Sequence, residues 1–513
     1  MDHSSKRRVT PAGIVNPDTR FVAVMPRRMR TGDKQGQGMK KQWALLIGGK
    51  WVTTDDILEV RSPYDDSLVA EVARASSAHI EEATSLAVKG FDVTRALTGY
   101  ERSRILELVS ASIALRAEEL AGILSLEAGK TIRDARVEVA RASNTFKVAS
   151  EEARRIGGEY IPLDWIQGSQ GRFGVTRRFP LGPILGITPF NFPLNLVAHK
   201  VAPAIAAGNS VVIKPASSTP LCSLVLGEIL VEAGFPPEAV SILPSRAAIA
   251  ETMVGDERFK LFSFTGSSDV GWRLKGLAGK KRVTLELGGN AAAIVDDDAP
   301  LDTTAEKCVR GAFANAGQIC ISIQRIYVHN NVYEPFIQAL VTKTKNLVLG
   351  NPQEERTDVG PLIDSSAVEK TETWVKEAVK GGARALTGAV RRGNIYEPTI
   401  LVDADPDMKV SCCEVFAPVV VVDRFSSIQE AILKTNDSTF GLQAGIFTQK
   451  IDAAIRAFEL LEVGGVVLND VPTYRIDHMP YGGVKDSGFG REGLKYAIEE
   501  MTELKLLAIN SRG

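Results

Sequence analysis

The sequence has little of what three classes of protein require. Its 61 lysines and arginines are matched by 62 acidic residues, and the resulting net charge of −1 argues against binding nucleic-acid phosphates. No apolar run reaches the roughly 18 residues that predict a membrane-spanning helix. The five histidines and five cysteines show no metal-ligand spacing, and the cysteines form no C-x-x-C pair or disulfide framework. We therefore expect no nucleic-acid, membrane or metal partner, and a location in the reducing cytoplasm.

What is present is ordinary for a globular protein. With 513 residues, of which 44% are hydrophobic and 24% charged, the chain should form two or three domains. Residues 1–42 differ from the rest because they are rich in lysine and arginine, poor in acids and without an apolar period. We interpret them as a disordered basic tail, or as a mis-started N-terminus with Met39 as the natural first residue. An organelle-targeting peptide is the alternative.

From residue 43 onward the pattern predicts an α/β fold. Long helical periods occupy residues 77–159, and short β-rich runs then alternate with helical stretches between residues 182 and 287. Such alternation is typical of a parallel sheet with helices on both faces, whose ligands lie at the carboxyl ends of the strands. A second set of strands and helices follows. We expect one domain from residues 43–159 and 180–287, and another from residues 288–490.

One thiol and one carboxylate stand beside glycines, as covalent thioester chemistry would need. Cys320 follows Gly317 after a helix-like run, and Glu286 precedes Gly288 and Gly289. A thiol attacks a carbonyl best as a thiolate, so Cys320 must lie where backbone N–H groups or a cation favour the charge. The carboxylate can act as a base toward water. A cysteine after a glycine is usually a small core residue, so context has to decide.

Seven motifs supply that context. In chain order they are Thr188-Pro-Phe-Asn191-Phe-Pro, Val212-Ile-Lys214-Pro-Ala, Phe264-Thr-Gly266-Ser, Glu286-Leu-Gly-Gly, Gln318-Ile-Cys320, Glu414-Val-Phe416 and Pro480-Tyr-Gly-Gly-Val-Lys-Asp-Ser-Gly-Phe-Gly490. With these motifs the chain resembles the aldehyde dehydrogenase superfamily from about Trp43 to about Asn510. The resemblance implies a Rossmann-like cofactor domain, a second α/β catalytic domain and a protruding β-hairpin for oligomerisation.

The hairpin has a sequence counterpart. Gly157 and Gly158 end a helical period, and residues 160–179 read as two strands around a Gly/Ser-rich turn. By the resemblance, a terminal strand within residues 500–511 joins them. An exposed two-stranded ribbon is marginal alone, so we expect a partner chain and a homodimer or homotetramer.

The resemblance also implies a mechanism. Cys320 attacks the aldehyde, and the Asn191 amide and the Cys320 backbone N–H hold the oxyanion. Hydride transfer to the nicotinamide gives a thioester, and Glu286 activates the water that hydrolyses it. The coenzyme-A-acylating relatives typically lack this base. Lys214 completes the predicted catalytic set, and Glu492 matches a glutamate sometimes assigned to proton relay, a role we leave open.

The cofactor is predicted to be NAD or NADP. Lys214 would contact the adenine ribose, and the position three residues later, acidic in many strictly NAD-using relatives, is Ser217. A serine there tolerates a 2′-phosphate, which favours NADP or dual use. The chain departs from the family at Ala417-Pro418, where Gly-Pro is usual. The predicted cofactor contacts are Thr188, Pro189, Phe190, Lys214, Ser217, Gly266, Ser267, Gly271, Leu287, Glu414 and Phe416.

The substrate should be a small aldehyde. Arg141 resembles a position that grips a distal anion in some relatives, although an ion pair with Glu138 on a solvated helix face explains it equally well. Arg475 is a second candidate contact. Against a strongly anionic substrate, Ile319 stands where some such relatives carry arginine. Two other functions are weighed: a non-catalytic scaffold of this fold, and a cofactor-independent thiol esterase.

Overall fold

The chain divides into two units, residues 1–39 and 40–513, and the computed structural model describes residues 41–512, which belong to the second. The predicted basic tail lies, except for residues 41 and 42, outside the described residues. In the described part no helix has both the length and the apolarity needed to cross a membrane.

The first sheet has eight strands in the order β24-β12-β11-β8-β9-β10-β2-β3. Its five central strands are parallel, whereas β24, β2 and β3 pair antiparallel at the two edges. The sequence pattern predicted the parallel centre but not the edge strand β24. The strands span β2 Leu45–Ile47, β3 Lys50–Val52, β8 Ile184–Ile187, β9 Val211–Lys214, β10 Val240–Ile242, β11 Leu261–Thr265, β12 Arg282–Glu286 and β24 Gly488–Phe489.

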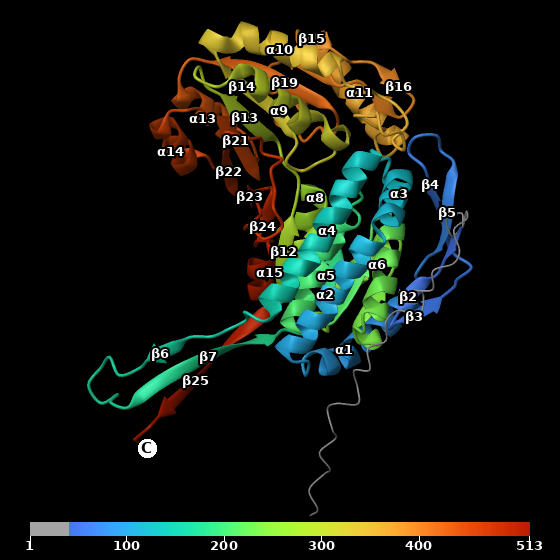
Figure 1. The fold of residues 1–513 in the computed structure, drawn as a ribbon, viewed down its shortest axis with the longest axis vertical. Coiled ribbons are helices and arrows are strands. Elements are labelled where there is room, and N and C mark those ends of the chain that lie inside the picture. Colours follow the sequence, from blue (N-terminus) through green and yellow to red (C-terminus); the bar gives the residue numbers. More distant parts are fainter. Residues whose placement is uncertain (1–40, 513) are drawn as a thin grey trace, which may run out of the picture. The chain divides into compact units, whose positions relative to one another are not determined.

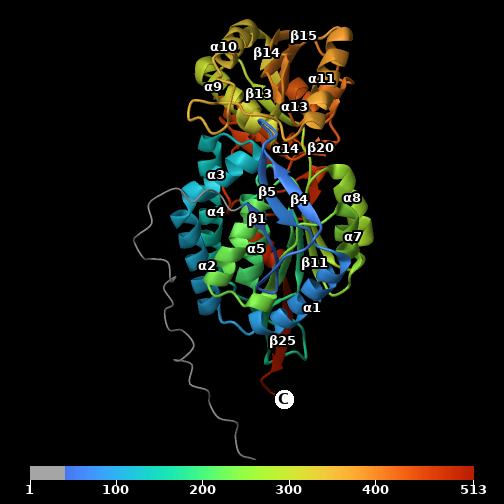
Figure 2. The same ribbon diagram turned by 90° about the vertical axis from the view of Figure 1, so that its right-hand side faces the viewer.

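Helices cover both faces of this sheet (Figure 2). One face carries α1 Ser77–Thr94, α7 Ala247–Gly255 and α8 Ser268–Leu277, and the other carries α5 Asn195–Ala207 and α6 Leu221–Glu232. A further layer, α2 Gly99–Leu115, α3 Ala117–Ala128 and α4 Ile132–Ala153, packs on α5 and α6, with α15 Leu494–Glu500 against α4 and α5. Every residue of α5 is buried, because this helix lies between the sheet and the outer helices.

The second sheet has seven strands in the order β15-β18-β19-β14-β13-β21-β22, all parallel except β15. They span β13 Ala291–Val295, β14 Ile323–His329, β15 Arg384–Thr387, β18 Thr399–Val402, β19 Val419–Phe425, β21 Gln443–Phe447 and β22 Gly465–Leu468. On one face lie α9 Leu301–Phe313, α10 Tyr333–Lys345, α11 Ser365–Lys380 and α12 Lys409–Cys412, and on the other α13 Ile428–Asn436 and α14 Ile451–Leu460. The predicted α/β fold class is confirmed.

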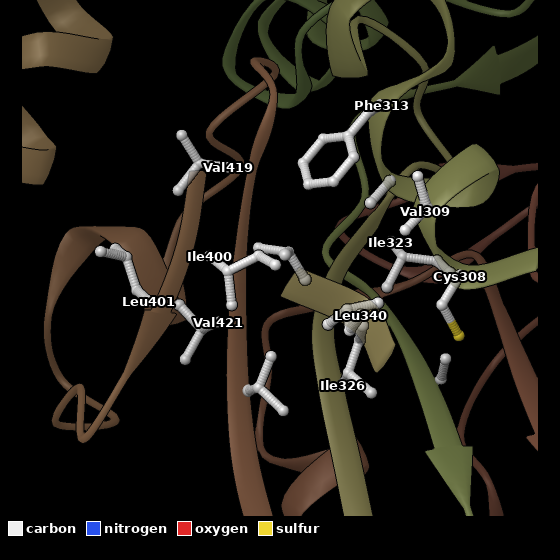
Figure 3. Packing of buried hydrophobic residues seen from close by; sticks show 14 of the residues in the cluster. Cys308, Val309, Phe313, Ile323, Ile326, Leu340, Ile400, Leu401, Val419 and Val421 are labelled. Atoms are coloured by element: carbon white, nitrogen blue, oxygen red, sulfur yellow. The ribbon is translucent and has the colours of Figure 1, made fainter. Parts of the chain in front are cut away.

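The core of this unit is apolar and closely packed. Phe313 and Val309 of α9 meet Ile323 and Ile326 of β14, with the Cys308 sulfur among the same side chains (Figure 3). Burial raises the pKa of Cys308 well above its ordinary value, so this thiol is a packing group.

A third sheet contains the predicted hairpin. Its strands are β6 Tyr160–Pro162, β7 Arg172–Pro180 and β25 Thr502–Asn510, and β25 pairs antiparallel with β7 from Thr502 opposite Pro180 to Asn510 opposite Arg172 (Figure 1). Leu504, Leu506 and Leu507 of β25 are exposed. The remaining short strands are β1 Gln42–Trp43, β4 Ile57–Arg61, β5 Leu68–Ala73, β16 Arg391–Arg392, β17 Ile395–Tyr396, β20 Phe440–Gly441 and β23 Val484–Lys485.

Candidate active site

Strand ends of the first sheet and a loop of the second α/β unit surround a large cavity. The parallel neighbours β8, β9, β11 and β12 end at Ile187, Lys214, Thr265 and Glu286, at one edge of the sheet. The cavity volume is about 800 Å³. Twelve residues predicted for the site line it: Arg141, Pro189, Phe190, Asn191, Gly266, Ser267, Glu286, Leu287, Cys320, Glu414, Phe416 and Arg475.

The loop that carries Cys320 has three consecutive left-handed residues. The φ angles of Asn315, Ala316 and Gly317 are +50°, +54° and +72°. A side chain at 317 is excluded, because a Cβ there would lie 2.3 Å from the Ala417 carbonyl oxygen. At the two non-glycine positions this conformation costs free energy that the surrounding packing must offset. The tight turn brings Cys320 to the cavity wall.

The Cys320 thiol is half-buried and lies 3.0 Å from the phenol oxygen of Tyr481, a hydrogen bond in which either group can donate. The Arg475 guanidinium carbon lies 3.6 Å from the centre of the Tyr481 ring. Burial raises the pKa of Cys320 to about 11, against the opposing effects of the Tyr481 hydrogen bond and the Arg475 charge. In this state the thiol is therefore protonated at neutral pH.

Glu286 is buried without a partner. Its residue is 3% exposed, and neither carboxylate oxygen has a hydrogen-bond partner among the described residues. Burial first, and the nearby Glu492 carboxylate second, raise the pKa of Glu286 well above its ordinary value. Keeping an unpartnered carboxylate in the interior costs stability, so its presence beside Cys320 indicates a chemical role.

A buried ion-pair network lies next to these two groups. Arg475 contacts one oxygen of Glu492 at 2.9 Å, and Lys200 contacts the other at 3.4 Å. Lys200 also donates to the hydroxyls of Ser263 and Thr265. Burial by itself would raise the pKa of Glu492, but neighbouring positive charges, chiefly Lys200, bring it to about 2. Glu492 is therefore ionised, and Arg475 is held by it.

A second buried ion pair supports the loop after β8. Lys130 pairs with Glu138, and it also donates to the Asn191 carbonyl oxygen at 2.7 Å. Glu138 accepts hydrogen bonds from the backbone N–H groups of Leu194 and Asn195, at 3.0 and 3.1 Å. These contacts fix the backbone at Asn191 and again at residues 194 and 195.

The alternative explanation of Arg141, a solvated ion pair with Glu138, is wrong. Glu138 is 1% exposed and pairs with Lys130, so it does not form a solvated ion pair with Arg141. The spacing of Glu138 and Arg141 along the helix allows such a pair. The buried contact with Lys130 instead directs the Glu138 carboxylate away from solvent. The Asn191 amide donates to the Gln318 carbonyl at 2.9 Å, which links the loop after β8 to the residues before Cys320.

Arg141 is oriented by a carboxylate 336 residues away. Its guanidinium contacts Asp477 at 2.7 Å, and the same oxygen accepts from Asn195 and lies 2.9 Å from His199 Nε2. Burial by itself would raise the pKa of Asp477, but the contacts with His199 and Arg141 hold it well below its usual range. The Arg141 side chain is 26% exposed and lines the cavity.

Two of the predicted cofactor residues, Lys214 and Glu414, differ in their partners. Lys214 is half-buried with no ion-pair or hydrogen-bond partner for its ammonium group in the described part of the chain, and burial lowers its pKa. Glu414 accepts from the Gly289 N–H at 2.9 Å, and burial raises the Glu414 pKa to about 7. The Phe416 ring meets Phe190 edge-on, with 5.9 Å between ring centres.

This geometry agrees with comparisons to known proteins. The family model described as "Aldehyde dehydrogenase family" matches residues 51–507. The chain belongs to the aldehyde dehydrogenase family. It is 46% identical over 471 residues to the 3-sulfolactaldehyde dehydrogenase of Priestia aryabhattai, a match that covers 92% of this chain and 98% of the relative.

Solved structures of the family share the fold. Aldehyde dehydrogenase 21 from Physcomitrella patens, solved in complex with the reaction product succinate, has a TM-score of 0.91 and 46% identity, covering 92% of this chain and 99% of that one. The glyceraldehyde-3-phosphate dehydrogenase GapN from Methanocaldococcus jannaschii, complexed with NADP, has a TM-score of 0.86 and 40% identity, covering 89% and 100%. The protein is therefore an NAD(P)-dependent oxidoreductase that oxidises small aldehydes.

Four predicted cofactor residues of this aldehyde dehydrogenase do not line the cavity. Lys214 and the exposed Ser217 lie at and just after the end of β9, and the Thr188 hydroxyl is buried without a hydrogen-bond partner among the described residues. The Gly271 N–H bonds to the Ser267 carbonyl, and a Cβ at 271 would lie 2.3 Å from Leu287. Gly271 therefore allows α8 to pack on the strand end.

The cavity also has contributors that the sequence motifs did not mark. Tyr481 stands in a quoted motif, yet nothing in the pattern placed its hydroxyl on the thiol. Lys130 precedes the long helix without a recognisable signal. The other unpredicted charged residues in the lining are Asp134, Lys307, Arg310, Lys370 and Asp470.

The described residues include one cluster with the spacing of metal ligands, outside the cavity lining: Asp296, Asp297 and His329. The Lys450 ammonium contacts both carboxylates, at 3.1 Å for Asp296. A protein cation therefore already offsets part of the charge of this cluster.

Proposed function

We propose that this aldehyde dehydrogenase oxidises a short aldehyde with a distal anionic group, through a thioester on Cys320 that Glu286 helps to hydrolyse. The observation that carries the proposal is the shared cavity: a thiol and an unpartnered buried carboxylate line it together with the oriented Arg141. The groups that would react and the group that would bind the anion thus face the same space.

The residues at the other end suit a dinucleotide cofactor. Lys214 has an ammonium group without a partner in the described chain, which suits ribose hydroxyls or a phosphate. Glu414 offers a carboxylate to the nicotinamide ribose, and Phe416 an apolar edge to its ring. When bound, NAD(P)⁺ supplies the hydride acceptor. Ser217, exposed beside Lys214, favours NADP or both cofactors.

Cys320 begins the chemistry. Its sulfur bonds to the aldehyde carbon, while the Asn191 amide and the Cys320 N–H stabilise the negative oxygen. Because burial keeps the thiol protonated, a base or a nearby positive charge must favour the thiolate first. The Tyr481 hydroxyl is placed to donate a hydrogen bond to that thiolate.

Glu286 acts at the second step. Loss of hydride leaves a thioester on Cys320, and a water that gives its proton to Glu286 attacks the acyl carbon. The raised pKa of Glu286 makes its ionised form a stronger base toward this proton, and only that form can accept it. Breaking the C–S bond releases the carboxylic acid and restores the thiol.

Basic residues at the cavity indicate the charge of the substrate. Arg141 is joined by Arg310 of α9, which is exposed and has no ion-pair partner among the described residues. The relatives from Priestia aryabhattai and Neptuniibacter caesariensis are a 3-sulfolactaldehyde and a sulfoacetaldehyde dehydrogenase, the latter 37% identical. A sulfonate or carboxylate two or three carbons from the aldehyde is the substrate class that these arginines fit.

The test is a panel of matched aldehydes. Purified protein is given neutral, carboxylated and sulfonated aldehydes of equal length, with NAD⁺ and NADP⁺ side by side and without coenzyme A. Arg141→Ala should raise KM for the anionic aldehydes by about tenfold or more and leave the neutral ones unchanged. The matched control is Arg136→Ala on the same helix, since Arg136 pairs with Glu118 and Glu355 outside the cavity. Equal losses on neutral aldehydes would refute the anion site.

The proposal also covers the domains, the oligomeric state and the location of the enzyme. We assign residues 43–159 and 180–287 to a cofactor domain and residues 288–490 to a catalytic domain, with residues 160–179 and 500–511 for oligomerisation. The exposed leucines of β25 support a homodimer or homotetramer, because a bare ribbon with apolar side chains gains from a partner. We place the enzyme in the cytoplasm, and light scattering and cell fractionation test these two points.

A further inference from the structure

Two adjacent cysteines lie next to the cofactor end of the site. Cys412 is the last residue of α12 and is exposed, and Cys413 follows it, half-buried. Their sulfurs are 3.7 Å apart. Cys222 and Cys308, in contrast, are fully buried. The sulfurs of Cys412 and Cys413 are thus a thiol pair that reagents in solution can reach.

The spacing suits one bridging atom better than a direct bond. Neighbouring Cα atoms are about 3.8 Å apart, whereas disulfides usually join Cα atoms about 4.4–6.8 Å apart, so a disulfide here would be strained. Two thiolates bound to one central atom at about 2.3 Å each stand about 3.8 Å apart at a tetrahedral angle, and closer at the smaller angles of a pyramidal centre such as trivalent arsenic. From the observed separation of 3.7 Å, a small rotation of the side chains brings both sulfurs onto one such atom.

The number of ligands limits what the bridging atom can be. In the described chain, no third histidine, cysteine, aspartate or glutamate joins this pair in a ligand cluster. A zinc ion would want four such ligands, so the site is poor for it. A trivalent organoarsenical needs only two thiols, because its third bond goes to its own carbon.

The backbone couples this pair to Glu414. The Ser411 carbonyl accepts from the Asn290 amide at 2.7 Å, and the Val415 N–H donates to Gln324 at 2.6 Å. These two hydrogen bonds hold the backbone at Ser411 and Val415. A backbone shift caused by modification of the cysteines is therefore confined to residues 412–414. The Glu414 carboxylate has little room, since a Cβ on Gly288 would lie 2.5 Å from it.

We propose that Cys412 and Cys413 form a modification site for trivalent organoarsenicals, and that its occupation weakens cofactor binding through Glu414. An arsonous acid reacts with both thiols: two As–S bonds form, two As–O bonds break, and the thiol protons leave in two waters. No atom changes oxidation state. The effect on the cofactor rests on the role proposed above for Glu414, whereas formation of the adduct does not.

The experiment uses phenylarsonous acid on the reduced full-length protein in an excess of monothiol, which removes reagent held by one sulfur. Cofactor binding by the unmodified protein is measured first, so a failure of the proposed cofactor site is seen before reagent is added. Intact mass then counts adducts, and a cofactor titration follows. We expect one adduct per chain, released by 2,3-dimercaptopropanol, and a cofactor Kd raised about tenfold.

The variants locate the site. Cys412→Ser and Cys413→Ser should take no adduct and keep their cofactor affinity in the reagent, while Cys320→Ser should take the adduct as the wild type does. No adduct on the wild type, or an adduct that persists in either of the first two variants, overturns the site. An adduct that leaves the cofactor Kd unchanged overturns the coupling to Glu414.

Discussion

Among the residues that the structure describes, the buried charges on one side of the cavity are all paired, whereas Glu286 on the other side is not. On the side of Lys130, Glu138 and Asp477, each charge has at least two partners, and the loop after β8 is fixed by them. On the side of Cys320, both oxygens of Glu286 have no hydrogen-bond partner in the described chain. The difference suggests that paired charges hold the scaffold and that the unpaired carboxylate is kept for reactants.

The substitution Cys320→Ala should have the largest effect on activity. It should lower kcat by a factor on the order of 10³ or more, because the covalent route is lost. The thermal midpoint should change little, since this half-buried thiol carries no scaffold charge. Reduced-nicotinamide formation and a melting curve measure the two. Full activity in the variant would show that Cys320 is not the nucleophile.

Glu286→Gln should also separate activity from stability. Loss of the base should slow steady-state turnover by a factor of about 10²–10⁴. The variant should unfold at the same temperature as the wild type or higher, because a neutral amide replaces a group that burial disfavours as an anion. Marked destabilisation would mean that Glu286 is a scaffold residue.

Lys130→Met tests the opposite side. It leaves the Glu138 carboxylate buried without its cation, which should lower the free energy of unfolding by about 3–5 kcal/mol in urea titrations. Lys130→Met combined with Glu138→Gln should recover part of that loss. If the single variant is as stable as the wild type, the Lys130–Glu138 pair does not stabilise the fold as described.

Tyr481→Phe should have the smallest effect. Removal of one hydrogen bond to the thiol should lower kcat by about tenfold at most. Because that bond lowers the Cys320 pKa, its loss should raise it, and alkylation by iodoacetamide should shift to higher pH. Tyr474→Phe, at an exposed tyrosine of the same cavity, is the matched control. An unshifted alkylation profile contradicts the contact.

Local sequence motifs predicted the reacting residues well and the buried charge pairs poorly. Asn191, Glu286 and Cys320 each stand at a strand end or tight turn whose sequence is distinctive, and all three line the cavity. The contact of Arg141 with Asp477 joins residues 336 positions apart, and no periodicity in the sequence encodes it. Arg475 was predicted as a substrate contact, and its bond to Glu492 could not be foreseen for the same reason.

The fold shows a similar division. The parallel centre of the first sheet and the strands of a second α/β unit were predicted, because these strands are apolar runs between helical periods. The edge strand β24 has two residues, too short for any alternation to be read. Its pairing is set by the neighbouring strand, so it appears only in three dimensions.

The most direct test of the central claim is a single-turnover experiment on Glu286→Gln with the preferred aldehyde and cofactor. The proposed division of roles between Cys320 and Glu286 predicts a rapid burst of one reduced nicotinamide per active site, followed by slow turnover, with an acyl adduct on Cys320 in the intact mass and peptide map. A variant that turns over steadily without a burst, or that carries the acyl group on another residue, would contradict it.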